Sequence, residues 1–178
     1  MGKDPVTTAT LTSPQLPAWE WRDIIATGRD RLVTMWSAGA TPKVQVPSQV
    51  LIKGVTDKLD RLIRLQAGWD GSDGLPTSTL AALSSVRFLL GVVTDDGPTP
   101  QVSPSPDGGV DISWQVAGSA LDLSVSRDGE FFLDAQSADG AEQFTYEFGM
   151  NEWSDDAVLR TRKFLYALSE SVLYRVHA

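Results

Sequence analysis

The feature that most constrains the fold is a change of hydrophobic period at Val110. Before this residue, apolar side chains recur at the three- and four-residue spacing of helices. After it, they alternate with polar ones in four short runs, at 110–116, 121–125, 131–135 and 144–148. Asp128-Gly129 lies between two of these runs and is a strong hairpin signal. The pattern predicts a four-stranded antiparallel β-meander with one buried face and one polar face.

Helical periodicity occupies the flanks of this meander. Three helices are expected within 17–94, in the segments 17–39, 48–67 and 76–93, and Ser48 and either Thr77 or Ser78 are suitable caps for the second and third. In the third helix, Leu80, Leu83, Val86, Leu90 and Val93 share one face, which Phe88 and Leu89 widen. Acidic residues precede basic ones by four positions in the second helix, which predicts the ion pairs Asp57–Arg61 and Asp60–Arg64. The fold class is therefore α+β, with helices packed on one face of the sheet.

The domain organisation follows from composition. Residues 1–16 are rich in Thr, Ser and Pro without a period, which predicts a flexible N-terminal arm. Residues 17–178 are expected to form a single α+β domain with a helical half (17–94), the meander (101–148) and a C-terminal helix (154–176). The segment 97–109 holds four prolines and three glycines and is interpreted as an exposed linker.

The segment 68–76 joins the second and third predicted helices with three glycines, two aspartates and a tryptophan. We interpret Trp69, Asp70, Gly71 and Asp73 as a structural turn. The carboxylates are expected to accept hydrogen bonds from nearby backbone amides and to cap the following helix. Trp69 is expected to pack between helix and sheet, with its N–H bonded to a carbonyl.

The alternative for these loops is a metal site. Asp70, Asp73, Asp107 and Asp111 lie in or beside two Gly-rich loops, and carboxylate oxygens suit Mg²⁺ or Ca²⁺. The spacing lacks the alternating ligands and the terminal Glu of an EF-hand loop. If the two loops meet in space, a metal-dependent hydrolase or a metal-binding module becomes the alternative function.

The chain lacks the residues that several kinds of catalysis and cofactor binding require. The chain has no cysteine, and its one histidine, His177, is the penultimate residue. The phosphate-loop, dinucleotide and zinc motifs do not occur. We therefore expect no enzyme activity and no cofactor. Because neither a leader-like start nor a long apolar run is visible, we expect a cytoplasmic protein that does not bind membranes.

Charge is distributed unevenly along the chain. The net charge is −8, yet residues 95–156 carry fourteen acidic side chains against Arg127 alone. Such a segment disfavours direct nucleic-acid binding, which needs Lys and Arg for phosphate contacts, and favours a basic protein partner. The predicted contact residues on the polar sheet face are Asp111, Asp122, Asp134 and Glu147. Trp19, at the start of the first predicted helix, is a further candidate because tryptophans are enriched at interface hot spots.

The segment 62–134 resembles a group of small bacterial and phage proteins of no assigned activity that share a Gly-Trp-Asp-Gly turn and a Pro-Asp-Gly-Gly loop. The matching residues are Gly68-Trp69-Asp70-Gly71, Pro76, Phe88-Leu89, Pro104, Pro106-Asp107-Gly108-Gly109 and Ser113-Trp114. Ser72-Asp73 departs from the small or aromatic residues expected at that point of the motif. The resemblance implies a fold and a bacterial or phage origin, and it brings no catalytic residues.

The leading hypothesis is a non-enzymatic protein-interaction module of bacterial or phage origin that uses an acidic sheet face. Antitoxin-like or immunity partners, defence or anti-defence factors and assembly partners belong to this class. The alternatives are the metal-dependent function and a phage structural or scaffold protein. The sequence does not predict the oligomeric state.

Overall fold

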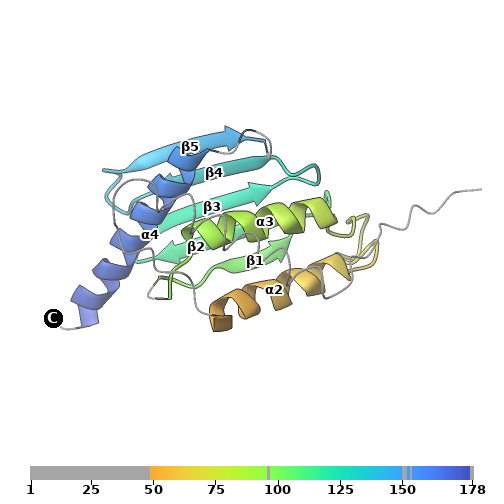
Figure 1. Cartoon of the computed structure of the whole chain (residues 1–178), viewed down its shortest axis with the longest axis horizontal. Helices are drawn as coiled ribbons and strands as arrows, with labels where there is room; N and C mark the ends of the chain where they lie inside the picture. Colours follow the sequence, from red (N-terminus) through yellow and green to blue (C-terminus); the bar gives the residue numbers. More distant parts are fainter. Residues whose placement is uncertain (1–48, 96, 150–151, 153, 177–178) are drawn as a thin grey trace, which may run out of the picture.

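The structure is a computed structural model that describes residues 49–95, 97–149, 152 and 154–176. Within these residues the chain forms three helices and five strands, which keep the labels of Figure 1. The elements in chain order are α2 (Gln49–Ile63), α3 (Thr79–Val92), β1 (Gln101–Pro104), β2 (Val110–Val116), β3 (Ser119–Val125), β4 (Phe131–Gln136), β5 (Gln143–Phe148) and α4 (Asp155–Val176).

The five strands form one sheet in the order β1-β2-β3-β4-β5, and every neighbouring pair is antiparallel. This confirms the α+β class and the antiparallel meander. The predicted number of strands was wrong, because β1 lies in the proline-rich segment that we interpreted as a linker. Four residues are too few to display a period, and Pro104 lies in an edge strand, where its missing N–H is tolerated.

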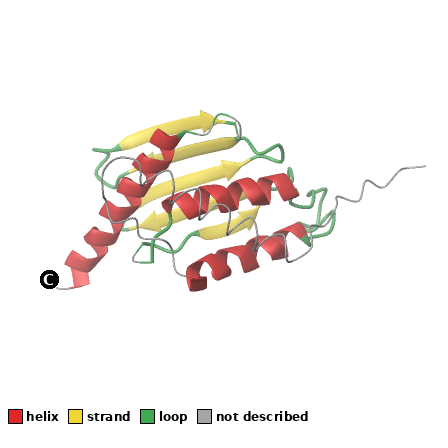
Figure 2. Ribbon diagram, viewed as in Figure 1, coloured by secondary structure: helices red, strands yellow, loops and turns green. Residues whose placement is uncertain are grey.

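The three helices lie on the same face of the sheet, which we call the inner face (Figures 1 and 2). The strands turn their apolar side chains to this face, and Trp114, Leu123 and Leu133 are almost completely buried there. Phe88 of α3 packs on Phe131, with ring centroids 5.9 Å apart. Burial of this apolar surface is the main force that holds the helices on the sheet.

Helix α3 buries part of the predicted face, because Val86, Leu89 and Val93 are buried as expected. Its buried residues include Ala81, Ser85 and Phe88, whereas Leu80 is 37% exposed and Leu83 and Leu90 are only partly buried. Small side chains at the contact allow the helix to lie close to the sheet, and Phe88 fills the space beyond them. A pattern based on large apolar residues therefore finds part of the buried face of the helix and misses its small residues.

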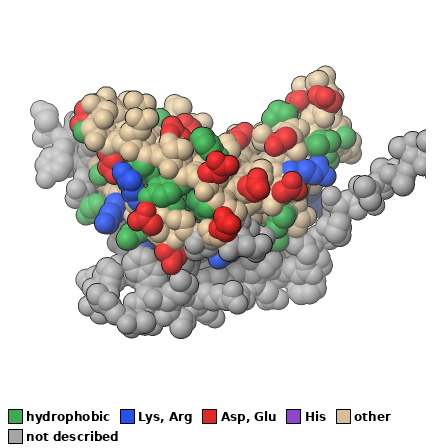
Figure 3. All heavy atoms as spheres, turned by 90° about the horizontal axis from the view of Figure 1, so that it is seen from above, with side chains coloured by type: hydrophobic (Ala, Val, Ile, Leu, Met, Phe, Trp, Pro, Cys, Tyr) green, Lys and Arg blue, Asp and Glu red, His purple; other side chains and the backbone are tan. Residues whose placement is uncertain are grey.

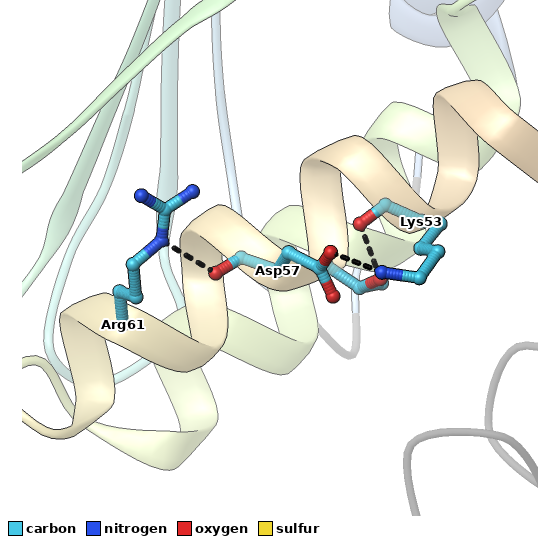
Figure 4. Close-up of polar contacts among 4 residues, drawn as sticks. Lys53, Asp57 and Arg61 are labelled. Carbon is cyan, nitrogen blue, oxygen red and sulfur yellow. Dashed lines mark hydrogen bonds and ion pairs between the residues drawn. The ribbon is translucent and has the colours of Figure 1, made fainter.

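The exposed side of α2 carries one of the two predicted ion pairs. Arg64 Nε lies 2.9 Å from Asp60 Oδ2. The predicted Asp57–Arg61 pair is replaced, because Asp57 pairs with Lys53, and Arg61 Nε donates to the backbone carbonyl of Asp57 at 3.1 Å (Figure 4). Lys53 lies four residues before Asp57 and so competes at the same helical spacing.

The C-terminal helix α4 begins after Ser154, whose Oγ accepts a hydrogen bond from Ala157 N at 3.1 Å. The predicted arm, the first helix, the Ser48 cap, Trp19 and His177 lie outside the described residues. In the part of the chain that the structure describes, no helix is both long and apolar enough to cross a membrane.

Candidate functional site

The face of the sheet opposite the helices is polar, and we call it the open face. The strand register arranges its side chains in rows that run across the strands. One row crosses all five strands and contains Gln101, Ser113, Asp122, Asp134 and Thr145. The row beside it contains Ser103, Asp111, Ser124, Phe132 and Glu147.

The four acidic residues predicted as partner contacts therefore share this face. Asp111, Asp122, Asp134 and Glu147 come from β2, β3, β4 and β5 respectively. None of the residues in the five described strands is Lys or Arg. Because adjacent strands lie about 5 Å apart, these carboxylates lie near one another, and the charged side chains of the open face are all acidic.

Local hydrogen bonds hold two of these carboxylates. Ser124 Oγ donates to Asp111 Oδ1 and Thr145 Oγ1 donates to Asp134 Oδ1, each at 2.8 Å. Asp122 lies directly opposite Asp134 on the neighbouring strand. Like charges in this position destabilise a sheet, and a bound cation would relieve the repulsion.

Phe132 is a member of the open face that sequence reasoning missed. Its side chain is 50% exposed and lies between Ser124 and Glu147 in the register. The signal was available, because two successive Phe residues in a strand must point to opposite faces and Phe131 is buried. An aromatic ring beside a carboxylate is a favourable place for a Lys or Arg side chain.

The side of the molecule that carries β5 shows the same charge imbalance. Figure 3 views the molecule from above relative to Figure 1, and so toward β5. Acidic side chains (red) are spread over this side, and basic side chains (blue) lie mainly toward its two ends. Among the described side chains, this side therefore also carries mainly negative charge.

The Gly68–Pro76 segment forms a closed turn. Asp70 Oδ1 accepts hydrogen bonds from the Ser72 and Gly74 amides, both at 3.0 Å. These bonds hold the pKa of Asp70 below its ordinary value, because they favour the charged carboxylate. Trp69 Nε1 donates to the Leu75 carbonyl at 3.0 Å.

The remaining turn predictions need two corrections. Trp69 is only half-buried and is not among the apolar residues that pack on the core, so it does not pack between helix and sheet as predicted. Gly71 has a φ of 80°, in the left-handed region that glycine adopts without strain, and Asp73 accepts from Ser72 Oγ at 3.1 Å. The cap of α3 is Ser78, whose Oγ accepts from Ala81 N at 3.0 Å. Asp70 and Asp73 do not take that role, because the chain still runs through Leu75 and Pro76 before α3 starts.

The two Gly-rich loops meet in space through their backbones. Leu75 N donates to the Pro106 carbonyl and Ser78 N donates to the Gly108 carbonyl, each at 2.8 Å. Ser78 Oγ also donates to the Arg127 carbonyl at 2.6 Å, which ties in the β3–β4 turn. We call these contacts the loop joint. It fixes the start of α3 against one end of the sheet.

The loop joint does not gather the four carboxylates of the metal alternative. Asp70 binds its own turn, Asp107 Oδ1 accepts from Gly109 N at 2.9 Å, and Asp111 lies on the open face with Ser124. A search of the described residues finds no cluster of three or more His, Cys, Asp or Glu side chains that could hold a metal ion. The loops meet, but their acidic side chains serve separate hydrogen bonds.

Comparisons of the chain with protein families, with characterised proteins and with solved structures found no match. The arguments about function therefore rest on the geometry of the chain itself.

Proposed function

We propose that this protein is a non-enzymatic interaction module of bacterial or phage origin, and that it binds a basic protein partner through the open face. One observation carries the proposal. Four carboxylates from four neighbouring strands share a sheet face that none of the described helices covers and that has no basic residue on its strands.

The arrangement favours recognition because its charges are held by a rigid sheet. Asp111 and Asp134 are oriented by hydroxyl donors on adjacent strands, so a partner does not have to order them. The concentrated negative potential accelerates encounter with a basic surface and repels acidic proteins. Mixed charge of both signs is usual on protein surfaces, and this face departs from that rule.

The biological roles that fit are an antitoxin-like or immunity partner, a defence or anti-defence factor, or an assembly partner. In each role the open face would bind a basic surface on another protein. The genes that lie beside the one for this chain would distinguish these roles, because a toxin, a defence protein or a phage structural protein would be encoded nearby.

The test compares two variants with the same change in net charge. In the first, Asp122, Asp134 and Glu147 are replaced by Lys on the open face. In the control, Asp57 and Asp60 on α2 and Asp128 in the β3–β4 turn are replaced by Lys. Asp57 and Asp60 lose only surface ion pairs with Lys53 and Arg64, and such pairs contribute about 0–1 kcal/mol each. Both are used as full-length bait in lysate of the source cell, and captured proteins are identified and their affinity measured.

The proposal predicts that the open-face variant loses a basic partner, that the control keeps it, and that raising salt weakens the wild-type complex. Equal capture by both variants, or capture of acidic proteins only, would overturn it. Circular dichroism on both variants checks that each is folded.

A further inference from the structure

The two edges of the sheet are not equivalent. An edge strand presents backbone N–H and C=O groups that have no partner within the sheet, and these groups can pair with another chain. The edge strands here are β1 and β5. Proteins commonly protect such edges with Pro, Lys, a short strand or a covering element.

The hairpin turns determine which residues of β5 face outward. Ser137 N donates to the Glu142 carbonyl at the start of the β4–β5 hairpin. Hydrogen-bonded and non-hydrogen-bonded pairs alternate along an antiparallel ladder. Phe144 and Tyr146 therefore bond to β4, whereas the backbone groups of Gln143, Thr145 and Glu147 point away from the sheet. All three of these residues are exposed.

The β1 edge is closed by several features. The same alternation, starting from Ser105 N and the Gly109 carbonyl, makes Val102 and Pro104 the outward residues of β1. Pro104 has no N–H to offer. Helix α2 packs beside this strand, and Lys58 Nζ donates to the Pro100 carbonyl at 3.3 Å (Figure 1). In contrast, β5 is longer and contains no Pro, Gly or Lys.

We propose that the β5 edge binds an extended basic segment of the partner protein as an added strand. The backbone of the segment pairs with Gln143, Thr145 and Glu147, and its alternate Lys or Arg side chains lie on the open face. This inference rests on the proposed function and assigns the partner's conformation and the strand that receives it. Strand addition of this kind obtains affinity from backbone bonds and specificity from alternate side chains.

Charge complementarity selects the occupant. A residue paired with Glu147 projects its side chain onto the open face beside the Glu147 carboxylate. From there, a Lys or Arg reaches the exposed ring of Phe132, which is the cross-strand neighbour of Glu147. A second copy of this chain would bring the same negative charge to the edge, and each chain carries a net charge of −8.

The inner side of the same edge discriminates against the opposite orientation of the segment. Arg160 of α4 lies there, with its Cζ 4.6 Å from the centre of the Phe144 ring and its Nε 3.9 Å from Glu142 Oε1. Basic side chains directed to the inner side would approach this guanidinium. The segment is therefore expected to turn its basic residues to the open face and apolar ones to the inner side.

The test uses a capped peptide of alternating Lys and Val as the probe, with binding followed by fluorescence anisotropy. A second peptide has the same sequence, but the backbone amides of its Lys residues, which would face β5, are N-methylated so that they cannot donate to the edge strand. A third peptide has Glu in place of Lys. We expect the first to bind, the N-methylated peptide to bind at least about tenfold more weakly, the loss typical of one or more hydrogen bonds, and the Glu peptide not to bind.

Two protein variants test the same contact by changing the β5 edge instead of the peptide. Thr145→Pro removes an outward N–H and leaves the ladder to β4 in place, and Thr145→Val is its matched control because it also loses the hydroxyl but keeps the amide. We expect Thr145→Pro to weaken binding about tenfold and Thr145→Val to bind as the wild type does. If Thr145→Pro does not fold, the comparison between the two Lys peptides still decides.

Equal binding of the parent and N-methylated peptides would overturn the inference, as would no binding of the parent peptide. A dimer of the free protein that Thr145→Pro dissociates would overturn it as well, since the edge would then be occupied by a second copy. These outcomes overturn strand addition at β5 but can be told apart from outcomes that overturn the proposed function. If the open face alone binds the partner, capture still depends on Asp122, Asp134 and Glu147 while N-methylation has no effect.

Discussion

The two faces of one sheet serve opposite purposes in this molecule. On the inner face, Trp114, Leu123 and Leu133 are covered by helices and exclude water. On the open face, the alternate residues of the same strands place Asp122 opposite Asp134 and leave Phe132 half exposed. The difference shows that the inner face supplies the stability, and the open face is free to carry charge that the fold does not need.

The largest expected effect comes from two adjacent residues of β4. Phe131→Ala removes a ring that stacks on Phe148 with centroids 4.8 Å apart, and we expect a loss of about 3–5 kcal/mol in the free energy of unfolding. Phe132→Ala, on the open face, should change it by less than about 1 kcal/mol. Urea unfolding of both variants measures the difference, and similar losses would remove the distinction between the faces.

The next effect concerns the loop joint, which holds α3 on the inner face. A Cβ at Gly108 would lie 2.9 Å from the Pro76 carbonyl oxygen, and Gly108 has a φ of 89°. We expect Gly108→Ala to cost about 1–2 kcal/mol for the left-handed backbone and about 1–3 kcal/mol more for the clash.

The matched control is Gly140→Ala in the β4–β5 turn. Gly140 also has a positive φ, of 69°, but a Cβ there would meet nothing within 4 Å. Gly140→Ala should therefore lower the free energy of unfolding by about 1–2 kcal/mol, the cost of the left-handed backbone alone. If thermal unfolding shows equal losses of stability for Gly108→Ala and Gly140→Ala, the close contact at Gly108 does not contribute to the loss.

A smaller effect with the opposite sign is expected on the open face. Asp122→Asn removes one charge of the like-charged pair with Asp134, and we expect it to stabilise the chain by about 0.2–1 kcal/mol at low salt. The gain should shrink as salt screens the pair. Asp57→Asn on α2 serves as the control, because it removes an ion pair and should not stabilise. Destabilisation by Asp122→Asn would contradict the interpretation that the Asp122 charge lowers the stability of the fold.

The smallest effect is a pH dependence in the Gly68–Pro76 turn. The pKa of Asp70 is lowered in the folded chain by the Ser72 and Gly74 amides. Its stabilising contribution is therefore present above the pKa of the unfolded chain, near 4, and is lost as the pH falls through the lower folded value. Asp70→Asn should reduce stability at neutral pH and flatten its fall on acidification. Chemical unfolding across this pH range would show parallel curves if the hydrogen bonds did not matter.

The sequence predicted the fold where a periodic pattern was long enough. Four strands and their polar faces followed from alternation at 110–148, and the shared face of Asp111, Asp122, Asp134 and Glu147 followed with them. β1 was missed because four residues ending in proline carry no period. The inner side of α3 was predicted only in part, because small residues such as Ala81 and Ser85 belong to it as well.

Other features depend on contacts that no local pattern encodes. The loop joint consists of backbone bonds between segments far apart in the chain, such as Ser78 N to the Gly108 carbonyl. The outward groups of Thr145 depend on the phase of a hydrogen-bond ladder, which is set by the turn at Ser137 and Glu142. A spacing rule also does not predict which of two basic residues pairs with an acidic one. Asp57 pairs with Lys53, four residues before it, and not with Arg61, four residues after it.

The central claim is that the open face is the binding surface. The most direct test is to map the binding of the Lys–Val peptide on the whole ¹⁵N-labelled chain by NMR. The account predicts that amide shifts concentrate on the β5 edge and the open face, at residues such as Phe132, Thr145 and Glu147, with little change along α2. Shifts that concentrate on α2, or that spread evenly over both faces, would contradict the claim that the open face is the binding surface.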